Sequence, residues 1–322
     1  MALYPLKLAP VLKMPLWSGA RLARDYGKVG ALQIGESWEL TVREGDCSLI
    51  ENGAYRGSSL AALLSDFKEA LLGRTPLVNG RFPLLIKLID AALPLSVQVH
   101  PDDALAALLE NDSGKTELWH ILAADKDAYI LYGLKEGVSL EKAALALQGE
   151  DFAQVMRRIP VSPGETYFIP AGLPHAIGEG VLLAEVQQSS DLTYRLYDYG
   201  RKDKNGQARP LHIEKGVRAL RTFNTDKIEA LRFEKGKAAH FGGELLANTP
   251  YFYAELLSVK EELSLPSAPY MRHLLCIEGE LTLWCEKEAY SVKQGESILL
   301  PALLPDVLLT GKGRLLLSAL PE

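Results

Sequence analysis

Two polar residues in one short strand are the first indication of chemistry in this sequence. In LSVQVHP (95–101), Gln98 and His100 stand two residues apart, so their side chains leave the same face of an extended chain, together with Ser96. Such a face either meets solvent at a sheet edge or points into a polar pocket, and the strand by itself fits both. A pocket would make these side chains candidate ligands.

The segment GETYFIPAGLPH (164–175) predicts a strand that ends in a tight turn. Thr166, Phe168 and Ile169 favour an extended chain, and Gly and Pro residues break it at each end. The turn would present His175 at a defined place. This spacing resembles the second of the two sequence motifs of the cupin superfamily, whose small β-barrels hold a metal ion inside. The alternative is a surface turn with an incidental histidine.

A carboxylate extends this set. Glu117 opens the strand in GKTELWHIL (114–122), whose other strand residues are mostly apolar, so it is either an exposed strand end or a ligand. His100, Glu117 and His175, with Gln98 as a fourth ligand, form a mixed N/O set that suits a borderline divalent cation, Zn²⁺ first, one per chain. The other histidines lack such a context, and we expect surface or core positions for His120, His212, His240 and His273.

Several segments together resemble one known family, the class I mannose-6-phosphate isomerases in their shorter bacterial form. The similar segments are SVQVHPDD (96–103), GKTELW (114–119), PAGLPHAI (170–177) and EVQQSSDLTYRLYDYGR (185–201), supported by IGESWEL (34–40) and LLIKLIDAALPLS (84–96). The resemblance covers most of the chain to about residue 220.

The resemblance implies roles for single residues. The family's zinc ligands are a Gln, a His two residues later, a Glu and a His, which here are Gln98, His100, Glu117 and His175. An arginine in the family's S-D-x-x-x-R segment is an active-site residue, here Arg195, and Lys115 resembles a catalytic-site lysine. The family usually has a His directly before that lysine. Gly114 stands there in this chain, so no role of that His carries over.

The charged residues fit a sugar phosphate as substrate. Lys87 lies within the apolar run LLIKLI, where a buried ammonium needs an anion such as a phosphate; an edge-strand lysine with its stem on apolar surface is the alternative. Arg195 offers a planar fork for a phosphate or a developing oxyanion, or it is a surface arginine.

Two carboxylates could move protons. Glu185 lies in the strand VLLAEVQQ (181–188) and is either an acid/base or a structural, hydrogen-bonded residue. Asp191 is either an acid/base for ring opening or a turn cap. We therefore expect catalytic roles for Arg195, Lys115 and Glu185, and substrate-binding roles for Lys87, Ser96 and Asp191.

The elements that must position these residues are mainly strands. Strands are predicted over 34–40, 84–101, 117–122, 128–133 and 181–188. Helices are predicted over 58–73, 103–111, 139–158, with a break near Gly149, and 211–223; a polar loop is predicted over 198–210.

An internal sequence repeat predicts two modules. GESILLPALLPD (295–306) aligns without a gap with residues 164–175, but Leu303 replaces Gly172 and Asp306 replaces His175. We therefore expect a mainly β protein of two cupin (jelly-roll) β-barrels, the second degenerate and metal-free, with helical insertions around the first. The metal-bearing catalytic domain would span 1–235 and the degenerate domain 236–322.

Composition excludes several classes of function. The chain has 322 residues, a formal net charge of -6 and no basic block, so a nucleic-acid partner is not expected. No apolar run reaches the length of a membrane span, and no signal peptide is recognised at the N-terminus. Three scattered cysteines without a CxxC pair fit a reducing, cytoplasmic location.

The sequence thus predicts a zinc-dependent isomerase that interconverts mannose 6-phosphate and fructose 6-phosphate through a cis-enediol, as a monomer or homodimer. Two alternatives remain. Two His and one carboxylate also form the facial triad of metal-dependent oxygenases, and cupins host many chemistries. The chain could also be a non-catalytic cupin that binds a sugar phosphate.

Overall fold

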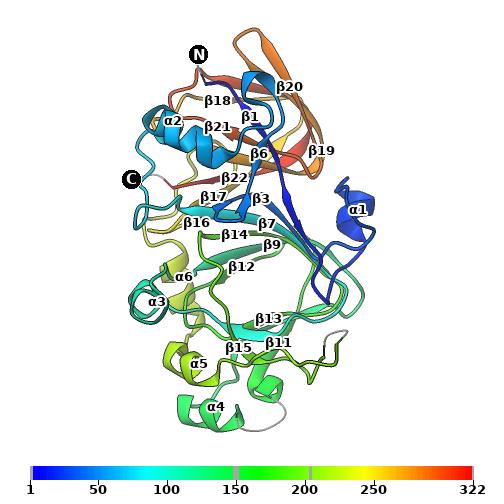
Figure 1. The fold of residues 1–322 in the computed structure, drawn as a ribbon, viewed down its shortest axis with the longest axis vertical. Coiled ribbons are helices and arrows are strands. Elements are labelled where there is room, and N and C mark those ends of the chain that lie inside the picture. The colour runs from blue at the N-terminus through cyan, green and yellow to red at the C-terminus, as the bar shows by residue number, and fades with distance from the viewer. Residues whose placement is uncertain (1–2, 148–151, 203–204, 321–322) are drawn as a thin grey trace.

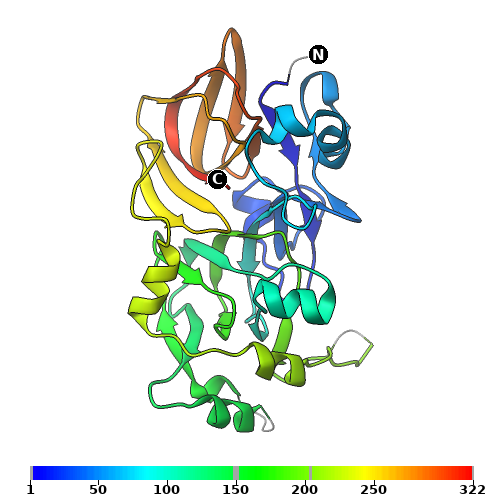
Figure 2. The same ribbon diagram turned by 90° about the vertical axis from the view of Figure 1, so that its left-hand side faces the viewer.

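Antiparallel β-sheets make up most of the molecule (Figure 1). The computed structural model describes residues 3–147, 152–202 and 205–320. In Figure 2 the C-terminal strands, yellow to red, form one end of an elongated molecule, and green helices lie at the opposite end. The prediction of a mainly β protein is confirmed.

A six-stranded sheet lies in the middle of the molecule (Figure 1). Its strands, in spatial order, are β12 (Thr166–Ile169), β9 (Glu117–Ala124), β14 (Val181–Gln188), β7 (Leu84–Ala91), β3 (Glu36–Leu40) and β2 (Val11–Lys13). β7 and β14 pair along their whole length and are buried at every residue. Both faces of this sheet are covered, and a strand covered on both faces carries apolar side chains on both, which explains the apolar runs in these two strands.

A five-stranded sheet lies opposite the six-stranded one (Figure 1). Its strands, in spatial order, are β11 (Met156–Pro160), β10 (Tyr129–Leu134), β13 (His175–Ile177), β8 (Val97–Val99) and β15 (Tyr194–Tyr197). The predicted strand over 84–101 is divided between the two sheets: β7 ends at Ala91 and β8 begins at Val97, with Pro94 between them. One continuous stretch of chain thus contributes to both walls of the space between the sheets.

A nine-stranded sheet holds the C-terminal strands together with two from the N-terminal segment. Its main path is β16 (Glu244–Asn248), β17 (Tyr253–Val259), β22 (Val307–Ala319), β19 (Arg272–Cys285), β21 (Ser297–Leu300), β1 (Leu6–Ala9) and β6 (Leu49–Ile50). Beside this path, β18 (Glu262–Leu265) pairs with β22 and β20 (Glu288–Lys293) with β19. A short hairpin joins β4 (Val42–Arg43) to β5 (Asp46–Cys47).

Short helices flank the sheets. They are α1 (Arg21–Asp25), α2 (Leu60–Leu72), α3 (Asp103–Glu110), α4 (Leu140–Ala146), α5 (Ile213–Ala219) and α6 (Thr225–Arg232), with 3-10 turns at Gly53–Tyr55 and Phe152–Val155. α2 begins at an N-cap, Ser59, whose side chain accepts from Ala62 N, and it ends at Gly73, as the sequence predicts. Within the described ranges, no helix has the length and apolar character needed to cross a membrane.

The prediction of one helix over 139–158 is wrong at its C-terminal end. α4 ends at Ala146, and β11 pairs with β10 where the helix was expected to continue. Pro160 cannot continue a helix but is tolerated in an edge strand, and β11 is the edge of its sheet. The predicted break at Gly149 lies outside the described residues. The sequence also missed α6, which Asn224 caps by accepting from Lys227 N.

Candidate active site and metal centre

Three buried side chains from separate parts of the chain converge between the two sheets. His100 follows β8, Glu117 opens β9 and His175 opens β13. One ligand atom from each lies within 4.8 Å of the others. His100 Nε2 is 3.2 Å from Glu117 Oε1, and His175 Nε2 is 3.7 Å from Glu117 Oε2. The structure therefore brings together three of the four predicted metal ligands.

The two imidazoles are oriented by backbone carbonyls. Nδ1 of His100 lies 2.7 Å from Leu192 O, and Nδ1 of His175 lies 2.8 Å from Leu173 O. Since a carbonyl oxygen only accepts, each Nδ1 carries the hydrogen and donates it, and each Nε2 keeps its lone pair. Both lone pairs then face the Glu117 carboxylate, an arrangement typical of histidines that bind a metal.

Burial keeps these imidazoles neutral. Desolvation, with the neighbouring His100, lowers the pKa of His175 to about 3, and desolvation and Lys115 lower that of His100. Within the part of the chain that the structure describes, His100 Nε2 and Glu117 Oε2 have no hydrogen-bond partner although both are buried. Unpartnered electron-pair donors that face one another in a dry site fit a cation between them. The residues present therefore suit a divalent metal ion.

Gln98, the fourth predicted ligand, lies beside this cluster. It is directly opposite His175 where β8 pairs with β13, and its amide nitrogen lies 3.3 Å from His175 Nε2. A carboxamide can turn to present its oxygen instead, so Gln98 is within reach of an ion held by the other three. The four residues come from strands and turns far apart in the sequence.

A polar cleft of about 310 Å³ opens next to the cluster. All the residues predicted to bind substrate or to act in catalysis line it: Lys87, Ser96, Lys115, Glu185, Asp191 and Arg195. Gln98 lines it as well, which connects the metal ligands with the cleft. The remaining predicted histidines, His120, His212, His240 and His273, lie outside the ligand cluster.

Lys87 is matched by carboxylates within the chain. Its ammonium lies 3.3 Å from Glu185 Oε1 and 3.7 Å from Glu36 Oε2, over the face of Trp38. Burial alone would lower the pKa of Lys87, but Glu185 and Glu36 outweigh it, so the pKa is raised. Lys87 therefore stays charged. Its predicted role as a phosphate partner stays a prediction.

Glu185 combines burial with two strong contacts. Trp119 Nε1 donates to its Oε2 at 2.9 Å, while Oε1 faces Lys87. Desolvation and the nearby charge of Glu117 raise the pKa of Glu185, and Lys87 opposes them. A carboxyl with a raised pKa can both take and return a proton near neutral pH, as an acid/base requires.

Lys115, which lines the cleft, forms an ion pair with Glu117, with 2.8 Å between Nζ and Oε1. Desolvation would raise the pKa of Glu117, but Lys115 and His100 lower it well below its usual range. Glu117 is therefore an anion, which is the state that a metal ligand needs.

Arg195 reaches the cleft from β15. Its Nη1 donates to Pro210 O at 2.9 Å, and among the described residues its buried Nε has no hydrogen-bond partner. Burial and the nearby Arg209 lower the pKa of this guanidinium. A buried N–H without a partner indicates an acceptor that arrives from outside, such as a substrate oxygen.

The sequence did not predict the other residues that line the cleft, among them Trp17, Glu36 and Arg209. Arg209 donates from Nε to Asp198 Oδ2 at 2.8 Å and lies over the Trp17 ring at 5.1 Å. The one sequence signal for Glu36 is its place in IGESWEL, a segment that carries the family resemblance. Arg209 sits in the polar 198–210 loop, where no local pattern distinguishes it from a solvated arginine.

Known proteins of one family match this chain. A family model described as phosphomannose isomerase type I, catalytic domain, matches residues 7–130, and one described as mannose-6-phosphate isomerase, cupin domain, matches residues 244–320. The chain is 35% identical to mannose-6-phosphate isomerase ManA of Bacillus subtilis over 98% of its own length and 99% of that protein. It is 34% identical to mannose-6-phosphate isomerase of Streptococcus mutans over 92% of each.

Solved structures agree. The crystal structure of mannose 6-phosphate isomerase from Bacillus subtilis superposes with a TM-score of 0.87 at 31% identity, covering 98% of this chain and 99% of that one. A mutant phosphomannose isomerase from Salmonella typhimurium, at 20% identity, superposes with a TM-score of 0.79 over 98% of this chain and 99% of its own, which shows the fold.

Proposed function

The chain belongs to the type I mannose-6-phosphate isomerase family, and from this premise we propose that it interconverts mannose 6-phosphate and fructose 6-phosphate with one zinc ion per chain. The observation that carries the proposal is the convergence of His100, Glu117 and His175 beside a cleft lined by Lys115 and Arg195. Metal ligands, cations and a carboxyl with a raised pKa are the groups that this reaction requires.

Gln98, His100, Glu117 and His175 would hold the zinc ion. When bound, it would act as a Lewis acid that draws electron density from the substrate's oxygens at C1 and C2. A set of two imidazoles, one carboxylate and one carboxamide leaves positions for those oxygens, unlike a closed set of four thiolates.

The isomerisation moves one proton between C2 and C1 and one between the two neighbouring oxygens, through a cis-enediol, with nothing gained or lost. We assign the carbon-bound proton to Glu185, because a raised pKa makes a carboxyl an effective base and acid in turn. Lys115 would orient the oxygens and offset their developing charge, and Arg195 would do so from the other side of the cleft with its unpartnered Nε.

Ser96 and Asp191 line the same cleft and would bind sugar hydroxyls or the phosphate. Lys87 and Arg195 are the candidate phosphate partners. Lys87 already has two carboxylates beside it, whereas Arg195 has an N–H without a partner among the described residues. That N–H would serve either the phosphate or the reacting oxygens, and not both.

We further propose that the two predicted domains, 1–235 and 236–322, are two cupin modules and that the second holds no metal. Glu117 pairs with Ile169 at the end of β12, and Arg272 pairs with Leu300 at the end of β21, so Arg272 stands where Glu117 does. Asp306 stands in the place of His175. A guanidinium cannot ligate a metal ion, which supports the metal-free assignment.

A coupled assay tests the proposed function. Mannose 6-phosphate should be converted to fructose 6-phosphate, mannose should not, chelation should abolish turnover, and zinc should restore it. Tight binding of the sugar phosphate without turnover by the metal-loaded protein would instead indicate a non-catalytic binding protein. Oxygen consumption by protein purified with iron would indicate an oxygenase.

A further inference from the structure

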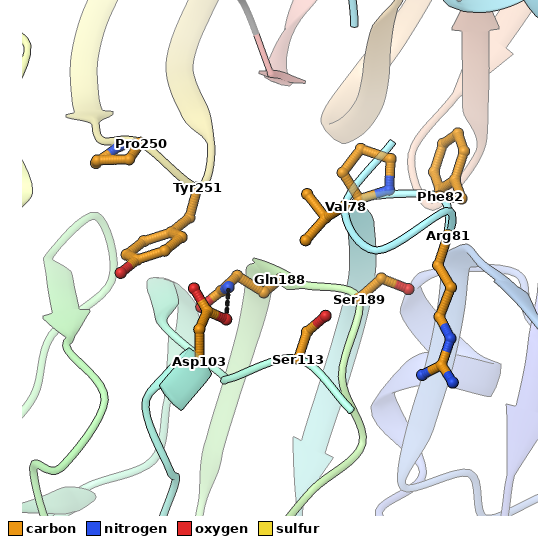
Figure 3. Close-up of a pocket in the computed structure, with 10 residues that line it drawn as sticks. Val78, Arg81, Phe82, Asp103, Ser113, Gln188, Ser189, Pro250 and Tyr251 are labelled. Carbon is orange, nitrogen blue, oxygen red and sulfur yellow. Dashed lines mark hydrogen bonds between the residues drawn. The ribbon is translucent and has the colours of Figure 1, made fainter. Parts of the chain in front are cut away.

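A second pocket lies beside the segment that carries Ser113 and Lys115, and Figure 3 shows Ser113 in its lining. It has a volume of about 190 Å³ and is lined by polar groups that include Asp103, Ser113 and Gln188. Ser113 faces this pocket and Lys115 faces the cleft, so residues 113–116, the Lys115 segment, separate the two. Whatever fixes this segment from the pocket side also sets where Lys115 enters the cleft.

Two side chains from the pocket bind the backbone of the Lys115 segment. Asp103 Oδ1 accepts from Gly114 N at 2.8 Å, and Gln188 Oε1 accepts from Thr116 N at 2.9 Å. Gln188 Nε2 donates to the same Asp103 oxygen at 3.1 Å, the dashed line in Figure 3. Gln188 N also donates to Thr116 O. The two side chains therefore brace each other as well as the segment.

A third amide of the segment, between these two, is held too. Lys115 N donates to Pro101 O at 3.1 Å, so three consecutive amides have fixed partners. At Gly114 the backbone lies so close to α3 that a Cβ would come within 2.5 Å of Asp103 N. A side chain at this position would therefore require the backbone of the segment or of α3 to move.

From this geometry we propose that Asp103 and Gln188 are positioning residues for the isomerisation: they hold the Lys115 segment so that the Lys115 ammonium meets the reacting oxygens. The inference rests on the proposed function, because it assigns these residues to that reaction. Neither lines the cleft, and both act through the backbone of Gly114 and Thr116.

The physical reason is the flexibility of lysine. Its ammonium sits on a four-carbon stem with many rotamers, so its place in the cleft is fixed only if its backbone is fixed. A displacement of about 1 Å of a catalytic group can cost about a hundredfold in rate. Loss of the bond from Gly114 N to Asp103 or of the bond from Thr116 N to Gln188 should displace the segment by less than about 1 Å. We therefore expect a smaller cost, about tenfold in kcat.

The test uses Asp103→Ala and Gln188→Ala in the full-length, zinc-loaded protein. We expect kcat for mannose 6-phosphate to fall about tenfold in each, while KM changes less than about twofold and the zinc content stays at the wild-type value. Asp103→Asn keeps the accepting oxygen and should restore most of the rate. Tyr251→Phe alters a polar group of the same pocket that has no bond to the segment and should behave as wild type.

A double-mutant cycle with Lys115→Ala separates positioning from a general structural effect. If Asp103 acts through Lys115, adding Asp103→Ala to Lys115→Ala should change the residual kcat by less than about twofold. The inference would be overturned if Asp103→Ala lowered kcat tenfold both in wild type and in Lys115→Ala. It would also be overturned if Asp103→Ala and Gln188→Ala both kept the wild-type kcat, or if they lost zinc in parallel with the rate. An inactive wild-type protein would overturn the proposed function, and the inference with it; an active one isolates the inference.

Discussion

Two strand–turn segments of this molecule share a backbone and differ in chemistry. In residues 164–175, Gly164 N donates to Ile121 O, and the Glu165 side chain accepts from Ser162 N. In residues 295–306, Gly295 N donates to Cys276 O, and the Glu296 side chain accepts from Lys293 N. The same turn is therefore built twice, from the same pairs of positions.

The ends of the two segments diverge. His175 is fully buried and faces His100 and Glu117, whereas Asp306 is exposed and accepts from Ser267 N at 2.7 Å. The same turn forms with a buried histidine at its end in one copy and with an exposed aspartate in the other. Under the proposed function, the residues at the end of the turn would make only the first copy a metal site.

Alanine substitutions of His175 and of Asp306, the last residues of the two segments, should give the largest difference in activity. His175→Ala takes away one of the four proposed ligands, and we expect kcat/KM to fall by about a thousandfold or more, because the bound Lewis acid would contribute several kcal/mol to the transition state. Asp306→Ala should retain activity within about twofold. Comparable losses in the two variants, measured in the coupled assay, would contradict the division of roles between the segments.

Arg195→Ala should separate turnover from metal binding at the proposed metal site. The guanidinium lines the cleft but is not one of the proposed ligands, so the variant should keep its zinc and lose about 10²- to 10³-fold in kcat/KM. Zinc content and turnover are measured on the same sample. Wild-type turnover would rule out the role proposed for Arg195.

His273 in β19 allows a comparison by pH. It is buried, and neither ring nitrogen has a hydrogen-bond partner in residues 3–147, 152–202 and 205–320. Burial together with Lys28 lowers its pKa to about 3. The unfolded chain takes up a proton at this residue below about pH 6.5, and the folded protein does not, so stability falls as the pH drops through this window.

His273→Leu should therefore lessen the acid sensitivity. Between about pH 6 and pH 4 the variant should lose about 1.4 kcal/mol less stability per pH unit than wild type, one proton's share. Denaturant unfolding of both proteins without metal measures it, since contributions of the ligand histidines then cancel. Parallel pH dependences would show that His273 does not titrate on unfolding.

The smallest effects should come from the turns themselves, with opposite signs. Gly172 has φ +91°, and a Cβ there would lie 2.5 Å from Arg221 Cγ, so Gly172→Ala should cost about 1–2 kcal/mol. Leu303 has φ +59° with its side chain 70% exposed. Leu303→Gly relieves that conformation, and glycine's larger unfolded-state entropy offsets part of the gain, which leaves a stabilisation of at most about 1 kcal/mol. Thermal unfolding measures both stabilities. If Gly172→Ala and Leu303→Gly were destabilised equally, the strain assigned to Leu303 would be contradicted.

Local patterns indicated the candidate ligand side chains, and the resemblance to one family favoured a metal site over the surface alternatives. Two-residue alternation placed Gln98 and His100 on one face, and a Gly-Pro turn placed His175, so geometry within a few residues carried the information. The predicted strands and the helices α2 and α3 rest on the same kind of signal.

What the sequence could not predict depends on distant partners. The carboxylates beside Lys87 come from Glu36 and Glu185, each about 50 to 100 positions away, and Gln188 meets Asp103 across 85 positions. β11 was taken for helix because its strand state is fixed by pairing with β10 and not by its own residues. No single segment contains these contacts.

The central claim is that one of the two turns holds a metal ion and the other does not. Metal analysis of protein purified without added metal tests it directly, on wild type, His175→Ala and Asp306→Ala. The account predicts one divalent ion per chain in wild type and in Asp306→Ala, and none in His175→Ala. Two ions per chain in wild type, or an ion retained by His175→Ala and lost by Asp306→Ala, would contradict it.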